Sequence, residues 1–386
     1  MTDNNFKLTK IAELNISDAK KYIDNFIIPL DDGTHAIHNN NVYKVIKDDV
    51  LKRTYFKRMS SELHKYYFSE KKDIRTITYD VNKPVLYDDK LNLCPKIIQT
   101  YKKFSECSSK AQKQAHIMLD HIKTVWCSSN LESYNFTLKW LSNMIRGNRN
   151  DSCIYLKGPQ GVGKSTPLEF IRAHVIGKLL SYQGGSNPIK SKFNSELSGK
   201  LMIMFEELEN FNVSEWRSIS SVLKRQITSP TLMIELKGCD AREEKNLNNY
   251  FILSNNNCIT DDDGRRYFIL DISTHRKIKT KENIEYWQNL YDCFNDECGQ
   301  AFYSYLMTIN LDKYNAQSYP LTNSKLDSYG QRLGSVEKFI KDEYVLNRKG
   351  ISKITVAMMH ENYKIYCSDN NLKSVTKIEY NKILKD

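Results

Sequence analysis

The stretch GPQGVGKST, residues 158–166, has the composition of a loop that binds phosphate groups. It matches the pattern GxxxxGK[ST], in which glycines let the backbone curl so that its N–H groups face phosphate oxygens. The predicted nucleotide-binding residues are Gly158, Pro159, Gln160, Gly161, Val162, Gly163, Lys164, Ser165 and Thr166. Within this pattern, Lys164 is expected to reach the outer phosphates of ATP and Ser165 to bind Mg²⁺. The loop alone does not distinguish a kinase from a transport ATPase or a helicase.

A pair of carboxylates follows the apolar run at residues 201–205, in the sequence LMIMFEEL. In a phosphate-loop ATPase the first acid at such a strand end holds magnesium, and the second can orient the attacking water. This assigns Glu206 to the metal and Glu207 to the water, although aspartate is more usual at the first position. The alternative interpretation is a strand that runs into a solvated acidic turn.

The segment SNNNCITDDDGRRYF, residues 254–268, contains two further candidates. Asn255, at the end of the apolar run YFIL, is predicted to contact the γ-phosphate and the attacking water, with Asn256 as the nearest alternative. Arg266, with Arg265 beside it, is a candidate arginine finger that a neighbouring subunit would supply to stabilise the transferring phosphoryl group. The alternative is a surface arginine pair bonded to the aspartates at 261–263.

Calcium and zinc sites do not fit the spacing of the acidic residues and cysteines. An EF-hand loop has glycine sixth and acidic ligands first and twelfth, but counting from Gly264 puts Ile259 and Leu270 at those two positions. The nine cysteines contain no paired CxxC spacing, so structural zinc is not predicted. Reduced thiols in a cytosol-like compartment fit this pattern best.

The elements that must position these residues are predicted from apolar periodicity. Short apolar runs alternate with helical stretches over 151–275, which indicates a parallel α/β sheet with strands at 153–156, 201–205, 250–253 and 267–272. Residues 111–150 read as a helical lead-in that ends at Gly147, with Trp126 and Trp140 in the core. Residues 1–110 form a small α+β module of unknown role. Residues 276–332 form a helical segment that includes a linker at 315–324, and 333–386 contain three helices, the last opened by a capping box from Thr376 to Glu379.

The overall composition bounds the partners and the compartment. Lysine and arginine number 57 against 46 acidic residues, a formal charge of +11 that suggests a polyanionic partner. The N-terminus MTDNNFKLTK lacks the apolar run of a secretion signal, and no stretch approaches the length of a membrane span. We therefore expect a cytoplasmic protein without a membrane partner, with a nuclear site of replication left open.

Taken in order, GPQGVGKST, MIMFEEL, LKGCDA, ILSN and DGRRYF resemble the superfamily 3 helicases, and most closely the helicase portion of the poxvirus-type and phage primase-helicases. The resemblance implies an AAA+ core at 151–275 and a winged-helix-like module at 333–386. It also implies an ATP- and Mg²⁺-dependent hexameric ring that translocates on single-stranded DNA, with Lys237 of a hairpin as the DNA contact. A separate primase or polymerase would be a further partner.

Other function classes remain open on the sequence alone. A small phosphate-loop kinase or a packaging ATPase would share the loop. An ATP-gated DNA-binding scaffold or loader without strong hydrolysis is a non-enzymatic alternative, and an RNA motor is another, since a hairpin that grips phosphates does not identify the sugar.

Overall fold

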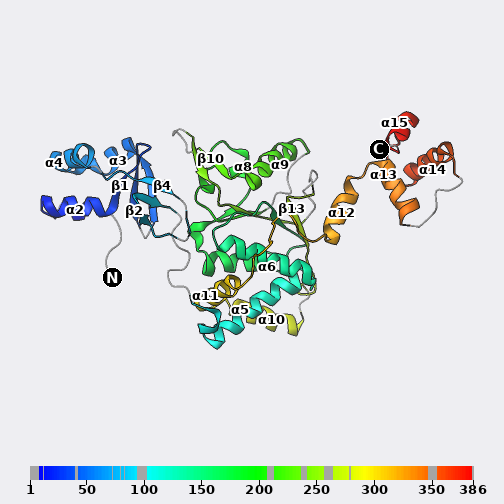
Figure 1. The fold of residues 1–386 in the computed structure, drawn as a ribbon, viewed down its shortest axis with the longest axis horizontal. Helices are drawn as coiled ribbons and strands as arrows, with labels where there is room; N and C mark the ends of the chain where they lie inside the picture. The colour runs from blue at the N-terminus through cyan, green and yellow to red at the C-terminus, as the bar shows by residue number, and fades with distance from the viewer. Residues whose placement is uncertain are drawn as a thin grey trace.

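The computed structural model describes residues 8–11, 13–39, 42–71, 73–78, 80–81, 83–93, 102–206, 213–235, 241–255, 264–277, 280–346 and 354–384. Three of the predicted or alternative site residues, Glu207, Lys237 and Asn256, lie outside these ranges. Figure 1 shows a small N-terminal module, a central sheet with helices on both sides, and a C-terminal group of helices. No helix in the described ranges is long and apolar enough to cross a membrane.

The N-terminal module combines short helices with two three-stranded sheets. One sheet is antiparallel, with the order β1-β2-β3, and the other has the order β4-β6-β5. Its helices are α1 Leu8–Ile11, α2 Ile16–Phe26, α3 Asp48–Thr54 and α4 Ser61–Lys65, and its strands are β1 Ile27–Pro29, β2 Thr34–Asn39, β3 Val42–Lys47, β4 Thr76–Thr78, β5 Leu86–Tyr87 and β6 Lys90–Asn92. The N-terminal module therefore has the α+β composition that the sequence predicted.

Two helices lead from this module into the sheet. Helix α5, Ser109–His121, continues through a wider turn at Ile122–Trp126, and α6 spans Leu131–Ile145. Ser108 and Asn130 cap their amino ends, each accepting a hydrogen bond from a backbone N–H three residues on. Trp126 and Trp140 are fully buried, so the predicted core positions are confirmed.

The centre of the molecule is a five-stranded parallel sheet with the order β13-β7-β12-β9-β8. The strands are β7 Cys153–Lys157, β8 Ser181–Gly184, β9 Met202–Glu206, β12 Asn249–Ser254 and β13 Tyr267–Asp271. Four of them were predicted to within one or two residues. Strand β8 was missed because SYQG contains no run of apolar residues. The mixed α/β class with a parallel sheet is confirmed.

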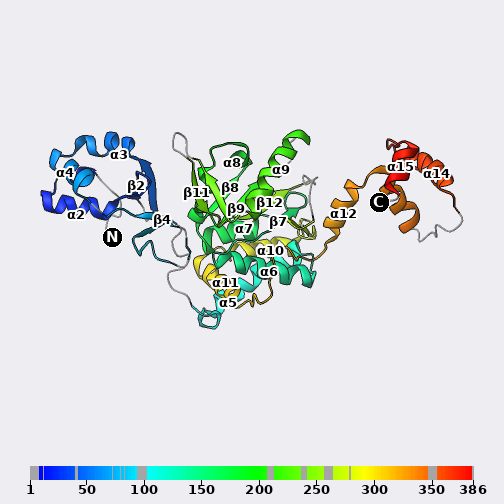
Figure 2. The ribbon, with the colours of Figure 1, turned by 45° about the horizontal axis from the view of Figure 1, so that its top comes forward.

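Helices cover both faces of this sheet, because alternate residues of each strand point to opposite sides. Ile154 and Leu156 pack into one hydrophobic core, whereas Cys153 and Tyr155 pack into another. Figures 1 and 2 show α5, α6, α10 and α11 on one side and α8 and α9 on the other. The bounds are α7 Thr166–Phe170, α8 Asn187–Lys190, α9 Val213–Thr228, α10 Lys281–Tyr291 and α11 Asp296–Met307. Burial on both faces explains the uninterrupted apolar runs in the sequence.

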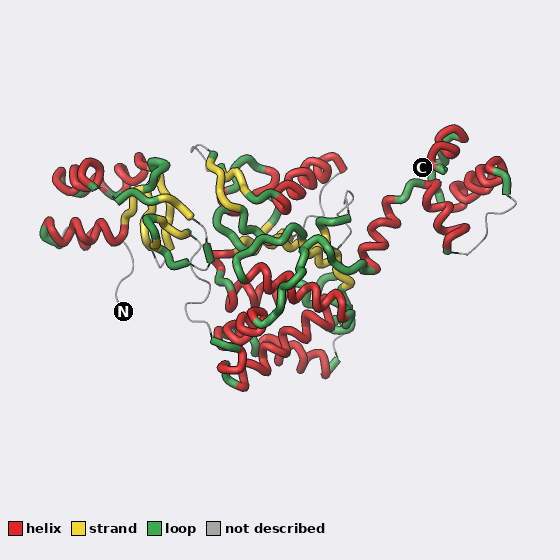
Figure 3. The backbone as a smooth tube through the Cα atoms, in the orientation of Figure 1, coloured by secondary structure: helices red, strands yellow, loops and turns green. Residues whose placement is uncertain are grey.

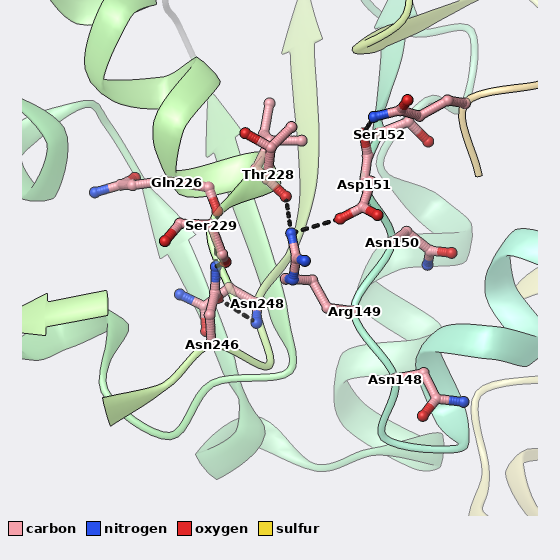
Figure 4. Close-up of polar contacts among 12 residues, drawn as sticks. Asn148, Arg149, Asn150, Asp151, Ser152, Gln226, Thr228, Ser229, Asn246 and Asn248 are labelled. Carbon is pink, nitrogen blue, oxygen red and sulfur yellow. Dashed lines mark hydrogen bonds and ion pairs between the residues drawn. The ribbon is translucent and has the colours of Figure 1, made fainter. Parts of the chain in front are cut away.

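A network of polar side chains lies at the amino ends of β7 and β12, and Figure 4 shows the part of it around Arg149. The fully buried Asn249 carboxamide accepts hydrogen bonds from the backbone and side-chain nitrogens of Asn150, at 2.9 and 2.7 Å. Arg149 donates to the carbonyl of Ile227 at 2.6 Å and pairs with Asp151 at 2.6 Å. These bonds pair buried polar groups at the amino ends of the two strands.

A β-hairpin projects beside the sheet between α9 and β12. It consists of β10 Thr231–Ile234 and β11 Arg242–Lys245, paired antiparallel, with Lys237 in the undescribed connection. The side chain of Asn194 braces β10, because it donates to the Met233 carbonyl at 2.8 Å and accepts from the Glu235 N–H at 2.9 Å. Arg242 contacts both Asp32 of the N-terminal module, at 3.6 Å, and Glu244, at 2.7 Å. The hairpin is therefore tied to the sheet domain and to the N-terminal module.

The segment 315–324, interpreted from its composition as a linker, lies against the edge strand β13. The Tyr319 hydroxyl donates to the Gly264 carbonyl at 2.6 Å, and the backbone N–H groups of Asn323 and Ser324 donate to the Asp271 carboxylate at 3.0 and 2.6 Å. Helix α12, Asn323–Arg332, starts here with Thr322 as its N-cap. These contacts cover the exposed edge of β13.

The C-terminal group consists of α13 Ser335–Ile340, which continues to Val345, α14 Val356–Asp369 and α15 Lys377–Ile383. The three predicted helices and the capping box from Thr376 to Glu379 are confirmed. Figure 3 shows helices and loops in this region, without a strand among the residues that are described.

Candidate functional site

The carboxyl ends of β7, β12 and β9 meet at one edge of the sheet. Ser254 pairs with Lys157 of β7, and Leu253 pairs with Glu206 of β9. Ligands of open parallel sheets bind in the crevice outside such strand ends. A cavity of about 490 Å³ lies at this edge. It is lined by Pro159, Gln160, Gly161, Gly163, Lys164, Ser165, Thr166, Glu206, Leu253, Ser254, Asn255, Trp287 and Tyr291.

The backbone of the loop 158–165 is left-handed at two of its glycines. Gly161 and Gly163 adopt φ angles of +77° and +92°, in the left-handed region that favours glycine. The Gly158 N–H donates to the Ser254 carbonyl at 3.0 Å, which ties the start of the loop to the end of β12. Helix α7 begins directly after the loop, with Pro167 in its first turn, where the missing N–H costs little.

Lys164 and Asn255 are brought together, as the sequence predicted for two residues of one site. The ammonium group of Lys164 donates to the Asn255 side-chain oxygen at 2.9 Å. It also donates to the carbonyls of Gly158, Pro159 and Ser254, the last two at 3.1 and 3.4 Å. The lysine therefore lies across the mouth of the loop, next to the residue assigned to sense the γ-phosphate.

Glu206 and Ser165 supply oxygen atoms to the same cavity. The Glu206 carboxylate is half-buried and accepts a hydrogen bond from the side-chain amide of Gln183 at 3.1 Å. Carboxylate and hydroxyl oxygens, few in number, suit Mg²⁺, which keeps several waters and binds substrate phosphates. Within the described part of the chain, no group of three histidine, cysteine or acidic residues is arranged to hold a metal on its own. The donor set fits a metal that is held jointly with a nucleotide.

Residues far away in the sequence support the phosphate loop, and sequence reasoning missed them. The His121 Nε2–H donates to the Gly163 carbonyl at 3.0 Å, while its Nδ1 accepts from the Tyr286 hydroxyl at 2.6 Å. The Trp126 indole N–H donates to the Lys164 carbonyl at 3.1 Å. A Cβ at position 163 would lie 2.6 Å from both His121 and Trp287. The loop is therefore held between α5 and α10. The glycine pattern predicted the loop, but no pattern in the sequence predicted the residues that support it.

The buried His121 makes stability depend on pH. Burial lowers the pKa of His121 from 6.5 to about 4, and the charges of His275 and Arg276 add to this effect, whereas the hydrogen bond to Gly163 opposes it. Between these two values the unfolded chain binds a proton that the folded protein does not, so stability falls as pH decreases from 6.5 towards 4. We expect a loss of about 2 kcal/mol between pH 7 and pH 5 from this group.

Thermal unfolding at pH 7 and pH 5 would measure this effect. The His121→Gln variant should show a smaller difference in Tm between the two pH values than the unmodified protein. His116, which is exposed on the same helix, provides the control: His116→Gln should keep the full difference. An unchanged pH dependence in His121→Gln would contradict the prediction.

Arg265 and Arg266 do not join the phosphate loop of the same chain. Strand β13 begins at Tyr267, which pairs with Cys153 at the start of β7, and the Cys153 N–H donates to the Arg266 carbonyl at 2.7 Å. The arginines therefore lie at the amino edge of the sheet, opposite the edge that carries the cavity. The sequence placed Asn255 and Arg266 in one connector, and the fold separates them by the length of the sheet.

The comparisons with known proteins agree with this arrangement at the level of the fold. Residues 156–266, which include the phosphate loop, Glu206, Asn255 and Arg266, match a family of unknown function, DUF5906. The chain superimposes on two apo structures of the C-terminal region of NrS-1 with TM-scores of 0.62 and 0.60. Each alignment covers 88% of this chain and 82% of the other, at 18% identity. This chain is thus an α/β protein whose fold is similar to that of the C-terminal region of NrS-1.

One relative of this chain is a phage protein. The DNA primase-polymerase of Nitratiruptor phage NrS-1 is 23% identical to this chain over 197 residues. The match covers 50% of this chain and 27% of the relative. The chain thus corresponds to a minor part of the phage protein's length.

Proposed function

We propose that this chain is the motor of an ATP-dependent DNA helicase that acts in viral, phage or mobile-element replication. The observation that carries the proposal is the meeting of Lys164, Glu206 and Asn255 at one cavity, beside a loop with two left-handed glycines. Similarity to a phage DNA primase-polymerase supports a role in replication. On this proposal the sheet is an AAA+ core of superfamily 3 type, and the helices after α12 belong to a winged-helix-like module.

The chemistry is hydrolysis of the bond between the β- and γ-phosphates of ATP. The loop N–H groups and Lys164 would hold the phosphates. Ser165 and Glu206 would hold Mg²⁺, and this ion would supply positive charge beside the phosphate oxygens. Asn255 contacts the γ-phosphate and orients the attacking water together with Glu207. In this scheme Lys164 exchanges its bond to Asn255 for bonds to phosphate, which couples nucleotide binding to the end of β12.

The position of Arg266 supports an active site that two copies of the chain share. Because it lies at the amino edge of the sheet, this arginine cannot reach the nucleotide of its own chain, and on this proposal it acts on the nucleotide of a neighbouring copy. The resemblance to superfamily 3 helicases implies a hexameric ring. In a closed ring every active site can be completed in the same way, because each subunit presents its arginine to the nucleotide site of the next subunit.

The hairpin β10–β11 is the proposed DNA contact, and the segment beside it has suitable chemistry. Lys190, Lys192 and Phe193 are exposed, Phe193 by 47%, next to the exposed Met233 of β10. Asn194 fixes this segment to the hairpin through its bonds to residues 233 and 235. Lysines that grip phosphates and an aromatic ring on which bases stack are the usual means of binding single strands without sequence preference.

The test is ATP hydrolysis by the purified chain with and without single-stranded DNA, together with separation of a forked duplex. We expect DNA to stimulate hydrolysis and ATP to be needed for strand separation. Phe193→Ala should weaken DNA binding by about 1–3 kcal/mol, the contribution of one base stack. Leu179→Ala, at another exposed apolar residue, should bind DNA normally.

Other outcomes identify the competing functions. Tight ATP binding without turnover would indicate a nucleotide-gated scaffold or loader. Stimulation by RNA alone would indicate an RNA motor. An absence of ATP binding would refute the proposal.

A further inference from the structure

Helix α10 places an aromatic surface at the cavity that the phosphate chemistry does not use. Trp287 and Tyr291, four residues apart and therefore on one face of the helix, both line the cavity with Gly161, Gly163 and Ser165. We call these two side chains the aromatic wall. Their rings are 6.1 Å apart between centroids and inclined by 31°, so they form a nearly continuous apolar face.

The inner half of the aromatic wall is fixed in position. The Trp287 indole N–H donates to the Arg276 carbonyl at 3.2 Å, and its ring lies against Gly163. The guanidinium of Arg276 stacks on Tyr286, 3.9 Å from the ring centroid, and bonds to Glu282 and Asn283 at 3.0 and 2.9 Å. Trp287 is therefore preorganised beside the phosphate loop, which lowers the entropic cost of binding against it.

The outer half of the aromatic wall, formed by Tyr291, is exposed to solvent. Tyr291 is 57% exposed, although it is a large aromatic residue at the end of a packed helix. It lies one helical turn, about 5.4 Å, beyond Trp287. A nucleotide whose phosphates occupy the loop must extend through its ribose away from Gly163. The aromatic wall runs outwards from this same glycine.

We infer that the aromatic wall holds the nucleobase of the bound nucleotide, with Tyr291 as the main stacking surface. The inference rests on the proposed function, because it assumes that phosphates occupy the loop. Stacking contact grows with ring area, so purine nucleotides bind more tightly than pyrimidine nucleotides. A π-face does not read the base edge, so ATP and GTP are both accepted.

Equilibrium binding of nucleotides and of inorganic tripolyphosphate to the full chain, with Mg²⁺ present, tests this inference. Tyr291→Ala should bind ATP about tenfold or more weakly, the loss of one base–aromatic stack. It should bind tripolyphosphate, which has no base, as the unmodified protein does. Tyr291→Phe, which keeps the ring, should restore ATP binding. Ile284→Ala is the matched control, since Ile284 is 53% exposed on the same helix and does not line the cavity.

The outcomes separate failure of the inference from failure of the proposed function. If Tyr291→Ala binds ATP normally, or if UTP and CTP bind as tightly as ATP, the aromatic wall is not the base site, while the phosphate loop keeps its role. If Tyr291→Ala weakens ATP and tripolyphosphate equally, the residue acts on the phosphate site and the inference is also wrong. If neither ATP nor tripolyphosphate binds, both proposals fail.

Discussion

Arg266→Ala is expected to lower the rate of ATP hydrolysis at saturating ATP by about 10³-fold or more, with ATP affinity nearly unchanged. Strand β13, Tyr267–Asp271, separates Arg266 from the edge that carries the phosphate loop. Five residues at about 3.3 Å each make this separation roughly 16 Å, which is farther than an arginine side chain extends. If Arg266 is the arginine finger of the proposed function, it must therefore act on the nucleotide of another copy, where it would stabilise charge that develops in the transition state.

Mixing two inactive variants distinguishes this arrangement from a self-contained site. Lys164→Ala lacks the phosphate contact and Arg266→Ala lacks the finger, but an intact site forms where the loop of the second meets the arginine of the first. We expect hydrolysis to recover on mixing and particle size to match a multimer. Arg265→Ala shows which arginine of the pair acts, and Arg225→Ala, at an exposed position on α9, is the control. No recovery on mixing would contradict a shared site.

Lys164→Ala is expected to lower the rate of hydrolysis by about 10²- to 10³-fold, the loss typical when one preorganised charged or hydrogen-bonding group is removed from a transition state. The lysine contacts Asn255 at 2.9 Å and carbonyls of its own loop. On the proposed function, this is where charge on the phosphates would develop. ATP affinity should fall as well, because the ammonium group also binds ground-state phosphates.

Steady-state kinetics and ATP titration would measure both effects. Lys178→Ala, at an exposed lysine in the turn before β8, should behave as the unmodified protein does. Circular dichroism and Tm should show that Lys164→Ala folds, since the residue lies at the surface of the cavity. Full activity in Lys164→Ala would remove the phosphate loop from the mechanism and with it the proposed function.

Several parts of the fold could be predicted because their causes are local. The phosphate loop needs glycines at 161 and 163 for left-handed backbone, and these residues are visible in the sequence. Strands β7, β9, β12 and β13 appear as apolar runs because the sheet is covered on both faces. The capping box from Thr376 to Glu379 is a hydrogen-bond pattern over three residues.

Other parts could not be predicted because they depend on contacts between distant segments. Strand β8 carries little apolar signal, and its place in the sheet comes from parallel pairing with β9, a contact between distant segments. The segment 315–324 looks like a linker from its polar and proline residues, yet its Tyr319 hydroxyl bonds to Gly264 and its Asn323 N–H bonds to Asp271 of β13. The winged-helix assignment and the roles of all the candidate site residues stay predictions. Glu207 and Lys237 also lie outside the described ranges.

By itself, the sequence determined which side chains are available for phosphate chemistry, because loop conformation and strand ends are encoded within a few residues. Only the tertiary structure decided which distant residues pack against these groups and which of the groups lie together at one site. It places His121 and Trp287, more than 40 residues away on either side, against Gly163, and it sends Asn255 and Arg266 to opposite edges of the sheet. The physical reason is that strand order and helix packing are set by burial of apolar surface across the whole chain, which no local pattern contains.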